Sequence, residues 1–303
     1  MELRVKIIAS DSTGVRSMAT FVDAGGVKIA IDPGVSYAPR RYGLPPHPIE
    51  LERVEKVRER IIDELQDTDI IIITHYHYDH YLYKPEDAEV YRDKWLIIKD
   101  PKASINVSQR IRAHRLLSRY DVSQLAKRID ILDAKSYKID GDLVIAGSEP
   151  VPHGAEGSKL GYVVMVSVEC CGERFLHASD VQGPISVRAL ETILSLKPDV
   201  VFISGPPTYF EGVKVPEEDV HRGLENLRQL ALKLPGSIIV ADHHFARDIE
   251  YLHRLRQLAE GAAARVISAA EFMGVPYEPL EALRRELWSR EKEREAANSD
   301  RAS

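Results

Sequence analysis

Three histidines and an aspartate lie within six residues of one another, in the run 75–80, which reads His-Tyr-His-Tyr-Asp-His. The run follows residues 69–74, a continuous β-branched stretch typical of a buried strand. Because alternate side chains of an extended chain share a face, His75 and His77 can point to one side and bind one cation. The aspartate and histidine that end the run could serve a second ion. Zinc accepts nitrogen and oxygen ligands of this kind, and so many of them in six residues disfavour the alternative, a loop of solvated histidines.

The pattern His75-x-His77-x-Asp79-His80 resembles the signature of the metallo-β-lactamase superfamily. The other parts of that signature can be found in order along the chain. They are an aspartate after an early apolar strand, a lone downstream histidine, an aspartate among small residues, and a histidine after a late buried strand: Asp32, His153, Asp180 and the pair His243-His244. The resemblance spans roughly residues 3–270. It is specific for the fold and the metal site, and much less so for the substrate.

The resemblance implies a dinuclear metal site. In chain order, the implied ligands are His75, His77 and His153 for the first ion, Asp79, His80 and His243 for the second, and Asp180 as the bridge. Asp32 would orient the metal-binding loop as an outer carboxylate. His243 is preferred as the ligand because it keeps the four-residue spacing to Arg247 that the superfamily's nuclease branch has. His244 is then a candidate for an outer supporting group or an acid.

Each downstream residue also has a structural explanation when taken alone. Asp32 could form only a turn, His153 could be a loop residue, and Asp180 could cap the following helix. Within the ordered set these explanations lose weight. The remaining histidines lack such support and are interpreted as surface or packing residues: His47, His114, His177, His221 and His253.

Metal-assisted hydrolysis is the implied chemistry. Two zinc-like ions lower the pKa of a shared water and stabilise the oxyanion that develops on a carbonyl or phosphoryl centre. Asp79 and Asp180 are the predicted catalytic residues, and no serine or cysteine nucleophile is required. The expected cofactors are two divalent metal ions, with zinc preferred and iron or manganese as alternatives.

Candidates for substrate binding lie in less regular segments. The proline-rich insertion 36–47 carries Arg40 and Arg41, which would suit a phosphate or carboxylate if the insertion overhangs the site. A surface loop with solvated arginines explains the insertion equally well. Tyr209 follows a buried strand and should face the site. Four more tyrosines can line the pocket or pack in the core: Tyr76, Tyr78, Tyr81 and Tyr83.

Hydrophobic spacing predicts the elements that position these residues. The expected strands are 3–9, 19–23, 27–31, 69–74, 95–98, 129–132, 143–146, 162–168, 174–177, 199–203 and 237–241, and the expected helices are 50–65, 104–120, 187–196, 217–234, 248–259 and 279–295. Hairpin, aspartate, helix and buried strand follow one another at Asp32 and again at Asp180, which indicates an old duplication. We therefore predict a single α/β domain over 1–303, a four-layer αββα metallo-β-lactamase-like sandwich. Its two similar halves would be about 1–150 and 151–275, followed by a C-terminal helix at 279–295.

Composition sets the broad class. The chain has 303 residues, 44% of them hydrophobic, and a net charge of −6, which disfavours a long nucleic acid as main partner. It contains neither a signal-like apolar segment at its start nor an apolar run long enough to cross a bilayer. The adjacent Cys170 and Cys171 cannot bridge without strain, so we expect a cytoplasmic protein with no membrane partner. Abundant Glu, Lys and Arg with few amides suggest a thermophile.

Three classes of function remain open. Hydrolysis of a small ester, lactone or phosphodiester suits the acidic composition and the insertion. Cleavage of RNA or DNA is not favoured, because neither a clamp domain nor a basic exosite is evident. A non-catalytic metal-binding protein is disfavoured by the complete ligand set. The insertion and the Asp-His-His ending most resemble an archaeal family within the superfamily, which brings a fold and a metal site but no reaction. The C-terminal helix could cover its own core or that of a partner in a homo-oligomer.

Overall fold

Two β-sheets form the centre of the molecule in this computed structural model, which describes residues 2–302, with side chains from 2 to 298. The first sheet has six strands in the order β1 (Leu3–Ile7), β2 (Thr20–Ala24), β3 (Val27–Ile31), β4 (Ile70–Ile73), β5 (Trp95–Ile98) and β6 (Arg128–Ile131). The second has seven, in the order β15 (Arg265–Ile267), β14 (Ile238–Asp242), β13 (Val200–Ser204), β12 (Glu173–Ser179), β11 (Val166–Cys170), β8 (Val144–Gly147) and β7 (Ser136–Lys138). A separate pair is β9 (Val151–Pro152) and β10 (Tyr162–Val163).

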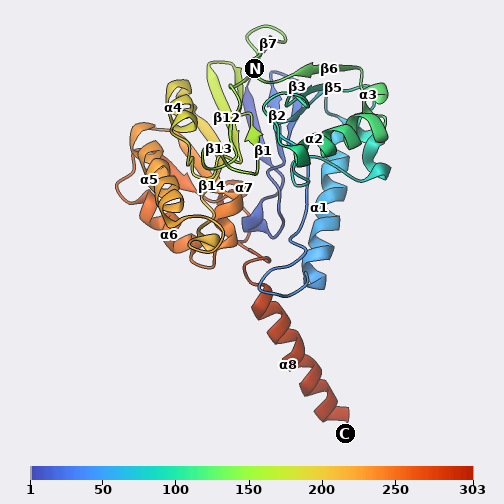
Figure 1. Cartoon of the computed structure of the whole chain (residues 1–303), viewed down its shortest axis with the longest axis vertical. Helices are drawn as coiled ribbons and strands as arrows, with labels where there is room; N and C mark the ends of the chain where they lie inside the picture. Colours follow the sequence, from blue (N-terminus) through green and yellow to red (C-terminus); the bar gives the residue numbers. More distant parts are fainter. Residues whose placement is uncertain (1, 303) are drawn as a thin grey trace.

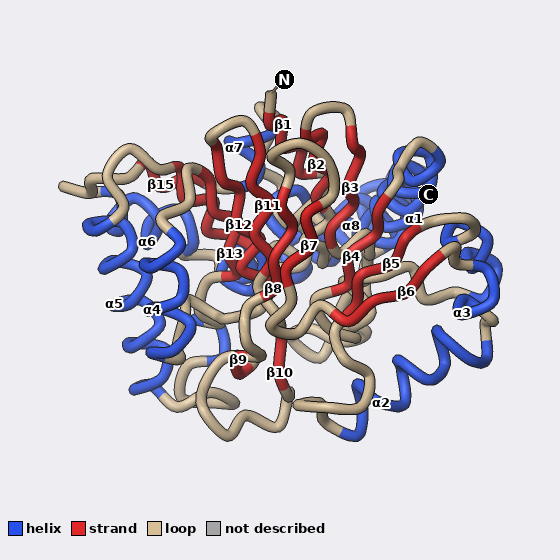
Figure 2. Tube along the Cα trace, turned by 90° about the horizontal axis from the view of Figure 1, so that it is seen from above, coloured by secondary structure: helices blue, strands red, loops and turns tan. Residues whose placement is uncertain are grey.

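Helices cover the outer faces of both sheets (Figures 1 and 2). On the first sheet's side lie α1 (Pro48–Gln66), α2 (Val107–His114) and α3 (Val122–Leu125), and on the second sheet's side lie α4 (Val187–Leu196), α5 (Glu217–Lys233) and α6 (Tyr251–Ala259). The short α7 (Ala269–Met273) follows β15, and α8 (Arg284–Ala302) ends the chain. The predicted αββα sandwich is therefore confirmed.

Three hydrophobic clusters fill the spaces between the four layers. The central one joins the two sheets, with Ile29 and Ile72 from the first against Val166, Phe202 and Val240 from the second. The other two lie between each sheet and its helices. Every residue of β4 is buried because both faces of its sheet are covered, which explains its unbroken run of isoleucines.

The same strand order occurs in both sheets. In the first, the antiparallel pair β2–β3 is followed by the parallel strands β4, β5 and β6. In the second, the antiparallel pair β11–β12 is followed by the parallel strands β13, β14 and β15. This agrees with the predicted repeat. The second sheet also takes β7 and β8 from residues before 150, so the chain changes sheets earlier than the boundary between the predicted halves. The division into a single domain stays a prediction.

Local chemistry explains most element boundaries. The β2–β3 turn uses Gly25 and Gly26, whose φ angles of 64° and 96° suit a tight hairpin. The helix α1 begins at Pro48, and its first turn is closed by a capping box in which the His47 backbone N–H donates to Glu50. His47 is thus a buried helix cap rather than a surface residue.

Three of the differences between the structure and the predicted elements concern long segments. The predicted strand 162–168 divides into β10 and β11, because the Val164 N–H between them turns to donate to the Thr74 carbonyl at 3.2 Å. The predicted helix 104–120 begins only at Val107, after its Asn106 cap, and ends in a π-helical turn at Arg115–Arg119. The last helix begins at Arg284 rather than 279. Within the described residues, no helix is both long and apolar enough to cross a membrane.

The start of α8 is fixed to the body, while the rest of the helix projects from it (Figure 1). Arg284 is fully buried, and its Nε and Nη2 donate to the two carboxylate oxygens of Glu50, both at 2.8 Å. Trp288 donates from Nε1 to the Pro45 carbonyl at 3.1 Å. The start of α8 therefore covers the chain's own core, at the insertion and the start of α1.

We expect Arg284→Ala to lower the free energy of unfolding by about 3–5 kcal/mol, because the Glu50 carboxylate would stay buried without its partner. Guanidinium denaturation of the variant and of Arg290→Ala, whose arginine is exposed on the same helix, measures the difference. Equal midpoints for the two variants would contradict a stabilising role for the buried pair.

A second ion pair makes stability depend on pH. Burial opposes ionisation of Glu281, but the charge of Arg16 and its hydrogen bonds at 2.6 and 2.7 Å lower the Glu281 pKa to about 2. A lowered folded-state pKa contributes stability above the ordinary value of 4.5 and loses it as the pH falls toward 2. We expect Glu281→Gln to destabilise the protein by on the order of 2 kcal/mol at pH 7. Denaturation curves at several pH values should show the difference in unfolding free energy between wild type and variant disappearing as the pH falls from 4.5 to 2. A difference that stays constant over this range would contradict the link between Glu281 ionisation and stability.

Candidate metal centre

The predicted site residues meet where strands of both sheets end. Asp32 follows β3, residues 75–80 follow β4, Asp180 follows β12 and His243 follows β14. The carboxyl ends of parallel strands are where α/β sheets commonly place ligands. Three of these strand ends are in the left-handed backbone region, with φ of 47° at Asp32, 55° at Ser179 and 54° at His243. Such conformations are costly for residues other than glycine, and they often mark functional sites.

The carboxylate of Asp180 is the centre of the cluster. The shortest distances from its oxygens to imidazole nitrogens are 3.0 Å for His153, 3.3 Å for His80, 3.4 Å for both His243 and His244, and 3.6 Å for His75. The ring of His77 lies beside those of His75 and His153, with centroids 4.6 and 4.8 Å apart. Asp79 Oδ2 lies 3.5 Å from His243 Nε2. All seven predicted ligands are therefore brought together.

Their donor atoms fit divalent cations. Four groups with ligand atoms within 4.8 Å of one another overlap here: His75, His77, His153 and Asp180; Asp32, His75 and His80; Asp79, His80 and His243; and Asp180, His243 and His244. Several buried atoms have no hydrogen-bond partner among the described residues: His75 Nε2, His80 Nε2, both ring nitrogens of His153, and Asp180 Oδ1. An unpartnered buried polar atom is costly, and a cation would satisfy these.

Outer carboxylates hold two of the histidines in place. Asp32 Oδ2 lies 2.7 Å from His80 Nδ1, and Asp32 is itself fixed by the Thr74 backbone N–H at 2.8 Å and hydroxyl at 2.6 Å. Asp11 Oδ2 lies 2.7 Å from His243 Nδ1. With Nδ1 engaged in this way, Nε2 of each ring faces the cluster. Asp32 thus lies where the resemblance implies.

Sequence reasoning missed Asp11, Arg247 as a contact residue, and His177. Asp11 lies in a short turn after β1, and the polar run Ser10–Thr13 is the only signal for it. Arg247 donates from Nε to Asp11 Oδ1 at 2.8 Å. His177 is fully buried on β12, with Nε2 3.1 Å from the Met18 carbonyl and Nδ1 3.9 Å from Asp32. Nothing in its surrounding sequence distinguishes it from a packing residue.

His243 and His244 occupy different positions. His243 is fully buried, and its Nε2 faces both Asp79 and Asp180. The side chain of His244 is 13% exposed, and its Nδ1 accepts from Arg247 Nη1 at 3.1 Å. Because arginine only donates, Nε2 of a neutral His244 carries the ring proton. His243 is therefore the inner histidine of the pair, and His244 is the outer one, with its Nε2–H directed toward the cluster.

Electrostatics divide the histidines of the cluster into two groups. Burial opposes protonation of His80 and His243, but the neighbouring carboxylates, Asp180 first, raise the pKa of His80 well above its ordinary value and that of His243 to about 9. Burial and the neighbouring imidazoles lower the pKa of His75 well below its ordinary value and that of His77 to about 3, so both rings are neutral near pH 7. Burial opposes ionisation of Asp180, but the surrounding histidines, His243 and His80 first, lower its pKa. Neutral imidazoles and ionised carboxylates are the forms that bind metal ions.

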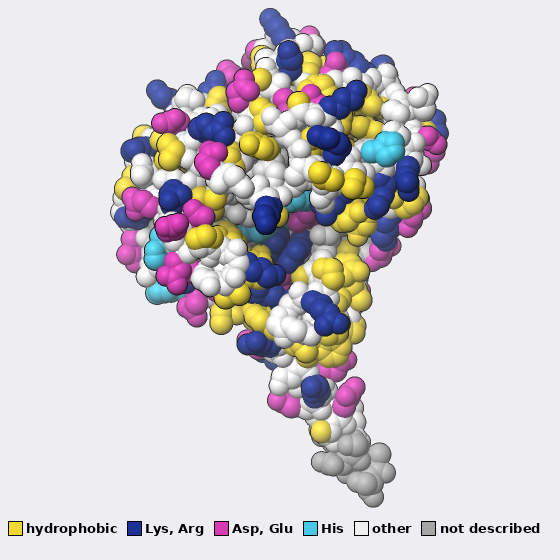
Figure 3. All heavy atoms as spheres, viewed as in Figure 1, with side chains coloured by type: hydrophobic (Ala, Val, Ile, Leu, Met, Phe, Trp, Pro, Cys, Tyr) yellow, Lys and Arg dark blue, Asp and Glu magenta, His cyan; other side chains and the backbone are white. Residues whose placement is uncertain are grey.

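An open cavity of about 460 Å³ lies over the cluster, and we call it the metal hollow. His77, Asp79, His153 and Asp180 are among its lining residues. Its walls include Arg16, Tyr37, Tyr78, Tyr83, Arg112, His244 and Arg247. Figure 3 shows a hollow in this face of the molecule, with histidine and basic side chains visible inside it. Of the four tyrosines near the motif, Tyr76 and Tyr81 are buried in the core instead.

The two arginines of the insertion lie in different environments. Arg40 is exposed and lines a cavity beside the metal hollow. Arg41 is only 8% exposed, with its guanidinium carbon 4.2 Å from the ring centroid of Tyr209 and its Nη2 donating to the Arg247 carbonyl at 3.2 Å. Arg41 therefore supports Tyr209, which lines the same cavity as Arg40.

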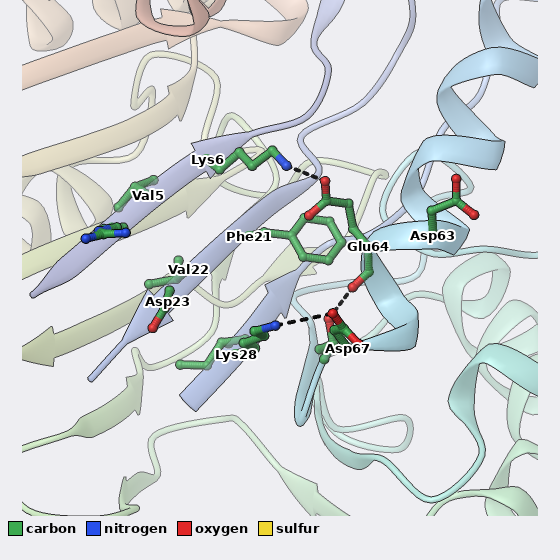
Figure 4. Close-up of a pocket in the computed structure, with 12 residues that line it drawn as sticks. Val5, Lys6, Phe21, Val22, Asp23, Lys28, Asp63, Glu64 and Asp67 are labelled. Atoms are coloured by element: carbon green, nitrogen blue, oxygen red, sulfur yellow. Dashed lines mark hydrogen bonds and ion pairs between the residues drawn. The ribbon is translucent and has the colours of Figure 1, made fainter. Parts of the chain in front are cut away.

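Another hollow, of about 510 Å³, lies between β1–β3 and the end of α1 (Figure 4). Its two lysines pair with acidic residues of the same hollow: Lys6 bonds to Glu64, and Lys28 Nζ lies 3.4 Å from Asp67. No histidine or cysteine lines it. The metal hollow is thus the better candidate for catalysis.

Comparisons with known proteins agree with this geometry. No family model matches the chain. It is 47% identical over 296 residues to a UPF0282 protein from Aeropyrum pernix, covering 96% of this chain and all of that protein. It is 42% identical over 295 residues to a UPF0282 protein from Methanopyrus kandleri, covering 94% and 99%.

Solved structures show the fold. The metallo-β-lactamase fold protein YhfI from Bacillus subtilis matches with a TM-score of 0.56 and 12% identity, over 88% of this chain and 97% of that one. Unliganded yeast PDE1 matches with a TM-score of 0.52 and 13% identity, over 87% and 96%. Identities this low show the fold alone. The chain belongs to the UPF0282 family of archaeal proteins and has the metallo-β-lactamase fold.

Proposed function

We propose that this chain is a metal-dependent hydrolase that uses two divalent cations. The ligands would be His75, His77 and His153 for the first cation, Asp79, His80 and His243 for the second, and Asp180 between them. The convergence of imidazoles with unpartnered nitrogens on Asp180, beneath an open cavity, is the observation that supports this most. Zinc suits such a nitrogen and oxygen set, and iron or manganese would also be accepted.

When bound, the two cations act as Lewis acids and lower the pKa of a water molecule toward neutrality. The protein supplies orientation and charge. Burial opposes ionisation of Asp79, but the charges of His80 and His243 lower its pKa, so it stays a carboxylate at the edge of the hollow. His244 presents its Nε2–H there and can donate a hydrogen bond to the oxygen on which negative charge develops. Arg247 holds the His244 ring in that tautomer.

The walls of the metal hollow favour an anionic reacting group. Arg16 and Arg247 line it but are paired with buried carboxylates. Arg112 lines it with no acidic partner among the described residues, and arginine suits phosphate and carboxylate oxygens. Among ester, lactone and phosphodiester substrates, we therefore favour a phosphodiester of a small molecule. Cleavage of RNA or DNA is the alternative for the same site.

The replacement Asp79→Ala should lower metal-dependent turnover of bis(p-nitrophenyl) phosphate by about 10³-fold or more, the scale on which coupled catalytic groups act. Bound zinc, measured by elemental analysis, should fall from about two ions per chain to about one. Lys233→Ala, at the far end of α5, serves as the control and should keep both values. Undiminished turnover in the Asp79 variant would contradict the proposal of metal-dependent hydrolysis at this site.

Replacing an outer carboxylate should weaken metal binding without removing a ligand. For Asp11→Asn and Asp32→Asn we expect zinc affinity to fall by roughly 10–100-fold, because His243 and His80 lose the charged partners of their Nδ1 atoms. Competition with a chelating dye measures the affinity, and circular dichroism monitors folding. Asp63→Asn, on the exposed side of α1, is the matched control. If all three variants bind zinc equally, the outer carboxylates do not act on the metal site.

A further inference from the structure

The metal hollow lies beside a second cavity of about 680 Å³, which we call the side chamber. The two cavities share five lining residues: Arg16, Pro39, Leu160, His244 and Arg247. The side chamber is therefore a neighbouring space for the remainder of a ligand whose reacting group lies over Asp180. Its outer walls come from the insertion, the loop after His153, and the segment between β13 and α5.

The side chamber has an excess of positive charge. Its only acidic lining residues are Glu156 and Asp219. Glu156 pairs with Arg188 at 3.2 Å, and Asp219 with Arg222 at 3.0 Å. Neither arginine lines the side chamber, so both acids are already neutralised from outside it.

The basic residues of the side chamber fall into two groups. Those shared with the metal hollow have buried partners: Arg16 pairs with Glu281 and Arg247 with Asp11. The outer three are exposed: Arg40, Lys159 and Lys214. Among the described residues none of these three has an acidic partner, and the Lys214 ammonium lies only against the Phe210 ring, 4.3 Å from its centroid. Cations left uncompensated around one cavity attract an anion.

Apolar side chains line the same space. Pro39, Leu160, Ile185, Phe210 and Val215 contribute carbon surface between the basic residues. Inorganic phosphate would leave this surface uncovered, whereas an organic molecule would bury it. The combination of apolar walls and unpaired cations therefore suits an organic anion.

We infer that the substrate is a small organic molecule with a second anionic group, a phosphate or a carboxylate, remote from the bond that is cleaved. The reacting group lies in the metal hollow, the organic body lies against the apolar wall, and the second anion meets Lys159, Lys214 and Arg40. The inference rests on the proposed function for where the reaction occurs, but the side chamber's preference for anions does not require turnover.

Calorimetry with two matched pairs of product-like probes tests this on the full chain in the presence of Zn²⁺. The first pair is adenosine bisphosphate, with phosphates on its three-prime and five-prime oxygens, against adenosine three-prime monophosphate. The second is adipate against hexanoate, which replaces one terminal carboxylate by a methyl group. We expect the doubly anionic member of at least one pair to bind roughly tenfold tighter, as two solvent-exposed ion pairs would give. The pair that shows it identifies the anion.

The double variant Lys159→Ala/Lys214→Ala should lose that preference. Lys127→Ala/Lys233→Ala, which removes two exposed lysines outside both cavities, should keep it. Raising the salt concentration should weaken the preference in the wild-type protein. Equal affinity within both pairs, or a preference that survives in the Lys159/Lys214 variant, would overturn the inference. If the wild-type protein shows no metal-dependent turnover but still prefers the doubly anionic probe, the proposed hydrolase function is rejected and the anion site is supported.

Discussion

A single buried carboxylate, that of Asp180, is the group around which the rest of the site is arranged. The imidazoles of His75, His80, His153, His243 and His244 lie between 3.0 and 3.6 Å from its oxygens. A buried charge is stable only when it is compensated, and these rings reach it from three separate segments of chain. The two sheets must therefore pack so that the ends of β4, β12 and β14 coincide. The central hydrophobic cluster fixes that relation, so the packing of the sandwich and the geometry of the candidate metal site are one constraint.

The supporting contacts repeat around this centre. Asp32 holds His80, and Asp11 holds His243, in both cases at 2.7 Å from Nδ1. Asp11 is linked through Arg247 to the ring of His244, so the inner and outer histidines after β14 share one ionic network. Each histidine is thereby restrained by a group anchored elsewhere in the fold. Little reorganisation is then needed when a cation or substrate arrives, which lowers the cost of binding.

The sequence predicted the centre better than its surroundings, for a physical reason. Buried strands and the ligands that follow them are local patterns, so the segment from β4 to His80 can be located from a dozen residues. Asp180 and His153 needed the ordered resemblance, because each alone is an ordinary loop residue. Asp11 and His177 act through contacts with residues more than a hundred positions away, which no local pattern encodes. Arg41 was predicted to contact the substrate, but it is buried against Tyr209. This burial depends on how the whole insertion folds, which its local sequence does not show.

Hydrogen bonds from two sides fix the insertion 36–47 in place, and its rigidity would affect which substrates are selected. Arg284 donates hydrogen bonds to the carbonyls of Ala38 and Leu44. Trp288 donates to that of Pro45. The start of α8 therefore anchors one side of the insertion. Arg41 fastens the other side, through the Arg247 carbonyl. A loop tied at both sides acts as a fixed wall rather than as a flap. Arg40 then stands beside a cavity whose shape is set before a ligand arrives, and selectivity would arise from fixed charge and volume. On this view the C-terminal helix contributes to recognition without touching the substrate, because it holds the wall from behind.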